Sequence, residues 1–194
     1  MFVRSPHLSR VLSIAVLAIV SACAAEQRAV IDKLDEVTAV TITYSRTPIT
    51  MSTDTYSDVA RDFVQIGAIE VNRMGTLNYY LWLGISQVIY AESTYTQPEE
   101  FESVVFAVSG EEFQLKILGW TQESIGAGER IYKKLFRNSA DAYYEVTLEQ
   151  IQLLIDVDAV RFRTTGPAAK EYEPWYRSFS AKDDLEEFLW AVSQ

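Results

Sequence analysis

This chain of 194 residues has 27 acidic and 17 basic residues, and its formal net charge is −10 at pH 7. Such a surface repels nucleic-acid phosphates, so we expect no nucleic-acid partner. An apolar content of 48% excludes a disordered chain and predicts a folded domain.

The first 22 residues have the three parts of a secretory signal peptide. Arg4 and Arg10 provide a basic start without any acid, an apolar run begins at Val11, and small residues precede Cys23. The alternative is a transmembrane helix, but the uncharged run is shorter than the roughly 20 apolar residues that span a bilayer. We therefore expect residues 1–22 to be removed as a signal peptide.

The sequence "VSAC" at residues 20–23 resembles the lipobox of bacterial lipoproteins, with Val20 at a position where leucine is more common. The resemblance implies cleavage before Cys23, a diacylglycerol on its thiol and a further acyl chain such as palmitate on its amino group. Several acyl chains anchor a protein stably, whereas one binds only marginally. Ala24 implies sorting to the outer membrane, where aspartate would imply retention in the inner membrane. The expected location is therefore the periplasmic face of the outer membrane; the alternative is an ordinary cleaved secretory protein.

The residues that are missing after the signal peptide exclude much chemistry. The only histidine is His7 and the only cysteine is Cys23. Without either residue in the domain, Ser-His-Asp and Cys-His catalysis, His/Cys metal sites and disulfides are excluded. We expect no cofactor, no metal and no enzymatic activity, and any chemistry would depend on carboxylates, tyrosine, lysine or an oxygen-ligated cation.

The predicted organisation is a lipidated N-terminus and short tether over 23–36, followed by one globular domain over 37–194. Val30, Ile31 and Leu34 lie at helical spacing and predict a short helix or an ordered lead-in. Alternating or β-rich patterns predict seven extended segments, at 37–44, 62–73, 77–92, 103–108, 111–120, 143–146 and 159–165.

Several local signals refine this pattern. Ser109-Gly110 predicts the turn of a hairpin, and Met74-Gly75 predicts another turn. Apolar residues change face around Gly67, which suggests a bulge. Residues 170–177 predict an edge or broken strand because Pro174 lacks an N–H.

Charged pairs across the last two extended segments are also expected. Glu171 and Glu173 are placed to pair with Arg161 and Arg163.

Two helices are expected late in the chain. Thr147 and Gln150 form a capping-box pattern. Leu185, Phe188, Leu189 and Val192 form the apolar stripe of a C-terminal helix. Strands followed by helices predict an α+β fold, with a mainly antiparallel sheet and both helices on one face. The alternative is a β-sandwich with peripheral helices.

The aromatic strand 77–92 is the most suggestive candidate binding site. Tyr80, Trp82 and Tyr90 share its second face. We expect the C-terminal helix to cover this face through Phe188 and Leu189. The alternative is an exposed aromatic platform that stacks on a sugar or a protein partner.

Further candidates lie near the second aromatic group and in the charged segments. Tyr172, Trp175 and Tyr176 sit where a partner strand can be added, although ordinary packing is the simpler expectation. Arg73 can contact an anionic ligand or form an ion pair. Acidic residues are dense at 99–102 and 183–187, and a solvated face is expected there. The glycines at 126 and 128 form only a weak phosphate-binding pattern.

These observations predict a lipid-anchored envelope protein with a binding or accessory role. Its expected partners are the membrane, through the lipid, and an envelope protein or a glycan. One alternative is a carbohydrate-binding or carboxylate-dependent glycan-hydrolysing protein, and another is a structural subunit of an envelope assembly. The stretch 67–84 resembles proteobacterial lipoproteins, but that resemblance implies no activity.

Overall fold

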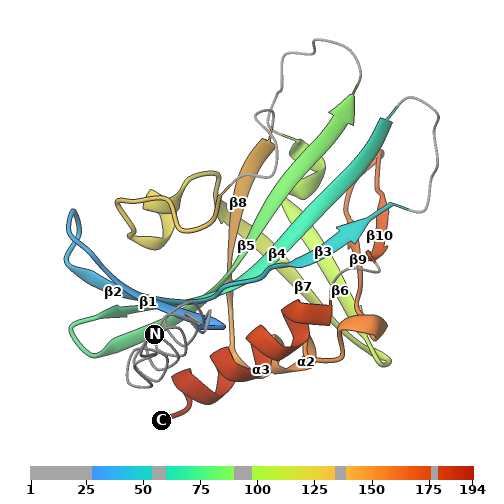
Figure 1. Cartoon of the computed structure of the whole chain (residues 1–194). Helices are drawn as coiled ribbons and strands as arrows, with labels where there is room; N and C mark the ends of the chain where they lie inside the picture. The colour runs from blue at the N-terminus through green and yellow to red at the C-terminus, as the bar shows by residue number, and fades with distance from the viewer. Residues whose placement is uncertain (1–27, 54–59, 90–97, 134–138, 176–178) are drawn as a thin grey trace, which may run out of the picture.

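The computed structural model describes residues 28–53, 60–89, 98–133, 139–175 and 179–194 (Figure 1). The described residues form strands and a few short helices, and the predicted hairpin over 103–120 is confirmed. The strands are β1 (Val30–Asp35), β2 (Val40–Ser45), β3 (Ile49–Ser52), β4 (Ala60–Arg73), β5 (Thr76–Ile89), β6 (Ser103–Val108), β7 (Glu111–Gly119), β8 (Ser139–Val146), β9 (Arg161–Thr164) and β10 (Glu171–Pro174). The helices are η1 (Glu99–Phe101), η2 (Gln122–Ile125), α2 (Leu148–Leu153), η3 (Val157–Ala159) and α3 (Phe179–Val192).

The sheet closes on itself into a barrel, so the predicted α+β fold with an open sheet is wrong. Strands β3 to β10 follow one another around an eight-stranded antiparallel barrel in the order β4-β3-β10-β9-β6-β7-β8-β5, and β5 pairs with β4 to complete the circle. The closing contact between β3 and β10 is short, with Glu173 opposite Ser52 and Pro174 opposite Met51. Because β10 has neighbours on both sides, it is not the edge strand that Pro174 suggested.

The long strand β4 joins the barrel to an extension made by β1 and β2. Its first part pairs with β3 and its second part pairs with β2, both along the same edge. On the other edge, β4 and β5 stay in register from Ala60 to Arg73, so the predicted bulge at Gly67 is absent from this pairing. The apolar residues change face because β4 leaves the barrel: Val64 and Ile66 face its interior, whereas Ile69 and Val71 face a separate apolar layer.

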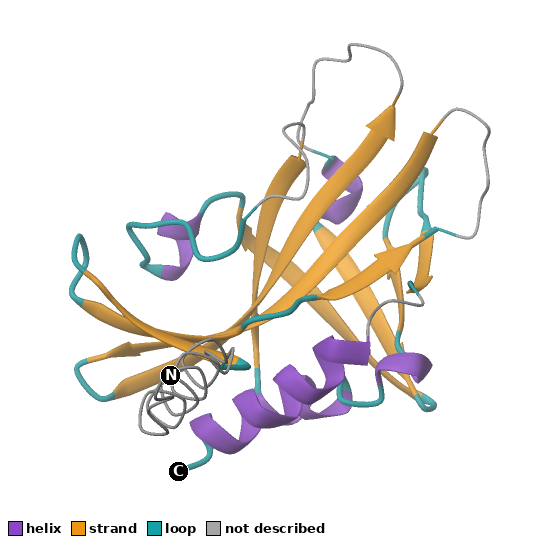
Figure 2. Cartoon of the chain, in the orientation of Figure 1, coloured by secondary structure: helices purple, strands orange, loops and turns teal. Residues whose placement is uncertain are grey.

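Helices α2 and α3 lie across one end of the barrel (Figure 2), not on a face of an open sheet. The capping box at the start of α2 is confirmed, since the Thr147 hydroxyl accepts a hydrogen bond from the Gln150 N–H and the Gln150 side chain accepts one from the Thr147 N–H. The apolar stripe of α3 buries Leu185, Phe188 and Leu189 in the same core as the barrel interior. This end of the barrel is therefore covered by apolar packing.

The described part of the barrel interior is filled with side chains, as eight-stranded barrels allow. Phe162 stacks on Tyr172, with ring centroids 4.5 Å apart, and on Phe106 at 5.5 Å. The buried hydroxyl of Tyr144 donates to the Phe101 carbonyl at 2.5 Å. The stacked rings link the neighbouring strands β6, β9 and β10, and the Tyr144 hydrogen bond links β8 to η1.

The N-terminal lead-in is ordered, as one of the two predicted alternatives had it, but the helix alternative is wrong. Val30–Asp35 forms strand β1, not a helix, and pairs along its whole length with β2. The predicted charge pairing is confirmed in part: Arg161 lies 3.7 Å from Glu173, but Arg163 pairs with Glu112 of β7 at 3.2 Å.

Candidate functional site

A loop over residues 120–133 covers the outer face of β2, β4, β5 and β8 and forms a second apolar core there. Its contributions are Ile125, Ala127, Ile131 and Tyr132. This second core lies outside the barrel wall, opposite the barrel interior. The outer face of the aromatic strand is therefore sealed by a loop that sequence periodicity alone does not place.

Tyr132 is the residue that seats this loop on the sheet. Its ring stacks on Trp82, with centroids 4.6 Å apart and planes 17° from parallel. Its hydroxyl donates to the carbonyls of Ser45 at 2.8 Å and Ala68 at 3.1 Å, at the break between β2 and β3. A side chain at Gly67 would collide with the Tyr132 ring, so glycine is needed there for close packing.

The candidate residues Tyr80 and Trp82 both lie under this loop, with exposed fractions of 9% and 1%. Their face is covered, as expected, but the covering element is the loop and not the C-terminal helix. Phe188 and Leu189 pack instead in the barrel core on the other side of the strand. Neither aromatic side chain offers a flat face to a sugar in this structure.

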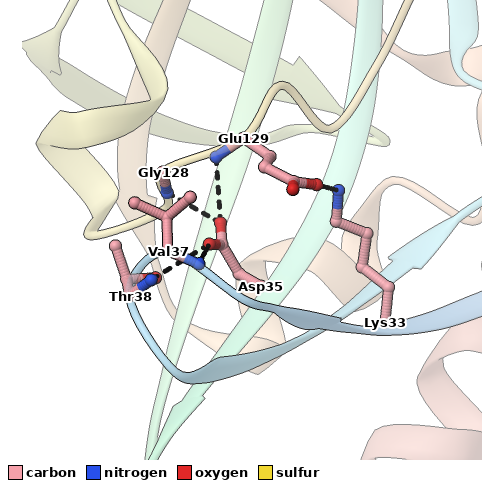
Figure 3. A network of polar contacts seen from close by, with 6 residues as sticks. All are labelled: Lys33, Asp35, Val37, Thr38, Gly128 and Glu129. Carbon is pink, nitrogen blue, oxygen red and sulfur yellow. Dashed lines mark hydrogen bonds and ion pairs between the residues drawn. The ribbon is translucent and has the colours of Figure 1, made fainter.

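Asp35 fastens the same loop to the β1–β2 hairpin (Figure 3). Its side chain is fully buried, and each carboxylate oxygen accepts two backbone hydrogen bonds. Oδ1 accepts from Val37 at 3.0 Å and Thr38 at 3.1 Å, whereas Oδ2 accepts from Gly128 at 2.7 Å and Glu129 at 2.9 Å. An ion pair from Lys33 to Glu129 at 2.7 Å closes the contact on the surface.

The four N–H donors keep this buried carboxylate ionised. Burial acts to raise the pKa of Asp35, but the hydrogen bonds from Glu129, Gly128, Thr38 and Val37 together lower it below its usual value. Gly128, one of the two glycines of the weak phosphate-binding pattern, thus helps to hold an anion, but that anion is the chain's own carboxylate. A β-carbon at Gly128 would lie 2.5 Å from Cβ of Val37, so the close approach requires glycine.

A second buried carboxylate, Asp141 on β8, lies in the same layer. It accepts a hydrogen bond from Nε1 of Trp82 at 3.1 Å and pairs with Arg130 at 3.4 Å. Burial and the negative charge of Asp141 raise the pKa of Tyr143, whose hydroxyl has no hydrogen-bond partner in the described structure. The buried carboxylates of this layer are thus engaged by backbone N–H groups, by the Trp82 indole and by Arg130.

Glu70 is a third buried carboxylate, and it lies on the opposite face of the sheet. It is only 8% exposed and its Oε2 has no hydrogen-bond partner in the described structure. Burial is the main cause that raises its pKa, the Asp32 charge adds to it, and a hydrogen bond with Tyr79 opposes it. Ionised Glu70 therefore opposes folding, whereas ionised Asp35 supports it.

The remaining candidates are not gathered into one site. Arg73 is exposed at the end of β4 and donates to the Gly126 carbonyl at 3.4 Å. Trp175 is half-buried and packs edge-on against Phe63 with centroids 5.6 Å apart, while Tyr172 faces the barrel interior. The other candidates, Cys23, Tyr90 and Tyr176, lie outside the described residues.

The acidic segments are partly used in packing. Asp184 of α3 accepts a hydrogen bond from the Thr47 N–H at 2.9 Å and so ties the helix to the β2–β3 connection. Asp183, Glu186 and Glu187 are exposed. Among the residues that the structure describes, no three histidine, cysteine or carboxylate side chains are grouped to hold a metal ion.

The ends of two hairpins carry exposed apolar side chains that sequence reasoning missed. We name this group the hairpin-end patch and define it by Leu34 (63% exposed), Val37 (72%), Met74 (100%) and Leu77 (44%). The β1–β2 and β4–β5 ends project from the same side of the barrel (Figure 1). The available signal was the apolar Met74 in a predicted turn, where polar residues are usual.

Comparisons with protein-family models, curated proteins and solved structures found no match to this chain. In the described part of the chain, none of the helices has the length and apolar character needed to cross a membrane.

Proposed function

We propose that this protein is a lipoprotein of the bacterial outer membrane, anchored through acylated Cys23 and facing the periplasm. The observation that carries this proposal is the sequence "VSAC" at the end of a basic and then apolar N-terminus. The chain's only cysteine stands at the one position where a lipobox requires it.

Within the envelope, we propose a binding or accessory role without catalysis. The absence of histidine after residue 7 and of any second cysteine supports this role, because the commonest acid-base and nucleophilic groups are missing. The engagement of Asp35 and Asp141 by neighbouring groups also supports it, since both carboxylates organise the fold. The partner is an envelope protein or a glycan, to be identified by pull-down of the acylated protein and mass spectrometry.

The anchor is tested by feeding cells radiolabelled palmitate and separating inner from outer membranes. We expect label in the wild type and none in Cys23→Ala, because the acyl chains are attached to Cys23. The acylated thiol is also the signal for cleavage. Ala24→Asp is the matched variant: it keeps the label but moves the protein to the inner-membrane fraction. Equal label in the wild type and Cys23→Ala would contradict the proposal.

A further inference from the structure

The residues of the hairpin-end patch belong to the sheet that β1, β2, β4 and β5 form beyond the barrel. Leu34 lies opposite Thr41, Thr41 lies opposite Asn72, and Asn72 lies opposite Leu77. Residues opposite each other in antiparallel strands point to the same face. The two leucines therefore share one face, and Val37 and Met74 lie in the turns at the ends of these strands.

Met74 is hard to explain by folding or by solubility. It has a φ of +52° and is followed by Gly75 at +87°, the left-handed pair of a type I′ turn that favours asparagine, aspartate or glycine. The matching turn between β6 and β7 has the small polar Ser109 at this position, with a φ of +50°. Met74 instead exposes its whole side chain to solvent. A residue that suits neither the backbone nor water indicates a contact outside the chain.

The chain leads to Cys23 from the start of β1, at the opposite end of that strand from the hairpin turn. The described chain begins at Arg28, and the Ala29 carbonyl accepts a hydrogen bond from the Arg46 N–H at 2.8 Å, beside the start of β1. A fully extended chain from Cys23 to Arg28 spans at most about 18 Å. The hairpin ends lie about 17 Å from Val30, along β1, which is no more than the length of this extended segment. A bilayer that holds acyl chains on Cys23 is therefore within reach of the patch.

Trp190 adds a side chain suited to a lipid boundary. It lies on α3, close to the C-terminal end, and is 67% exposed. Figure 1 shows this end of α3 on the same side of the barrel as the hairpin ends. Indole rings favour the interface between the headgroups and the acyl chains. The net charge of −10 disfavours an anionic surface, so the matching surface is zwitterionic.

We propose that the hairpin-end patch rests on the zwitterionic bilayer that holds the acyl chains of Cys23, and so orients the domain on the membrane. This inference rests on the proposed lipid anchor and adds a second, non-covalent contact to it. The acyl chains supply the affinity, and the patch of four side chains sets which face of the domain meets the lipid.

The test uses the acylated protein reconstituted into vesicles of phosphatidylethanolamine and phosphatidylcholine. Since acylation occupies Cys23, a cysteine placed by Met74→Cys is the only free thiol and accepts an environment-sensitive fluorophore. Ala168→Cys is the matched control, because it is also exposed in a turn but belongs to the β9–β10 connection. Lipids with a shallow nitroxide quencher then report which label touches the bilayer.

We expect quenching at position 74 to exceed that at position 168 by several-fold. Equally weak quenching at both positions in an acylated protein would overturn the inference and leave the anchor intact. Weak quenching at 74 in vesicles, together with protection of the Met74→Cys thiol from labelling in whole envelopes, would also overturn it, in favour of a protein partner. Mass spectrometry of the purified protein separates the two proposals, because an unacylated Cys23 would defeat both.

Discussion

Replacing Asp35 by asparagine tests how the 120–133 loop is held. Asparagine keeps the size of the side chain but has one acceptor oxygen and one NH2 donor. In the structure each oxygen of Asp35 accepts two N–H groups, so in either orientation the new NH2 group faces two donors. The local pair from Val37 and Thr38 is the easier one to keep, since asparagine commonly bonds to the backbone of its own turn. The pair from Gly128 and Glu129 is then lost.

The expected loss follows from these contacts. A hydrogen bond to a charged group contributes about 1.5–3 kcal/mol, and a buried group left without a partner costs about 1–3 kcal/mol. Release of part of the loop relieves some of this cost. We therefore expect Asp35→Asn to lower the free energy of unfolding by about 2–4 kcal/mol at pH 7.

The loss should depend on pH in one direction. Because the pKa of Asp35 is lower in the folded protein, its ionised form stabilises the fold above the usual aspartate value of about 3.9. This contribution disappears as the pH falls through the folded pKa. The difference between the wild type and Asp35→Asn should therefore be full near pH 7 and shrink below about pH 4.

Denaturant unfolding at several pH values measures the difference, and amide hydrogen exchange locates it. Protection should fall first at Gly128 and Glu129, which donate to Asp35. Asp32→Asn is the matched control on the same strand, where the side chain is exposed, and it should change little. A pH-independent loss, or unchanged exchange at residues 128 and 129, would refute the reasoning.

Three further predictions concern single side chains. Trp82→Ala should lower the free energy of unfolding by about 3–5 kcal/mol because the ring is 1% exposed. Trp190→Ala on the surface should change the free energy of unfolding by less than about 1 kcal/mol, and equal losses for the two variants in denaturant unfolding would contradict the burial of Trp82. Glu70→Gln should stabilise the protein by about 1 kcal/mol at pH 7, since the raised pKa of Glu70 makes its ionisation oppose folding. This gain in stability should vanish as the pH falls below the usual glutamate pKa of about 4.3, and a gain that persists in acid would count against this account. Met74→Asn should raise the free energy of unfolding by about 0.5–1 kcal/mol because asparagine suits the left-handed turn, and a lower melting temperature than that of the wild type would exclude the turn argument.

Local structure could be predicted from the sequence where residues close together in the chain determine it. The β6–β7 hairpin needs only two alternating strands and the Ser109-Gly110 turn, and the start of α2 needs only Thr147 and Gln150. The expectation of a tether helix failed because Val30, Ile31 and Leu34 fit either period, and pairing with β2 decided for a strand. Strand β3 went unpredicted because four residues carry too little periodicity.

The candidate site could be predicted from the sequence only in part. An apolar second face on β5 follows from alternation, but alternation does not say which distant segment covers it. The cover is decided by Tyr132 fitting over Gly67 and by Asp35 bonding Gly128 and Glu129, contacts between residues more than 60 positions apart. No pattern within a short window contains both partners of such a contact.

The sequence by itself determined four features of this protein: the lipobox-like N-terminus, the absence of histidine and thiol from the domain, the acidic net charge, and the positions of most strands. Only the tertiary structure decided that these strands close into a barrel, that α2 and α3 cover one end, and that Tyr80 and Trp82 lie beneath a loop. Strand formation depends on alternation and turn residues within a few positions. Barrel closure depends on whether the edges of β3 and β10 meet after the whole sheet has twisted, and that is a property of all the strands together.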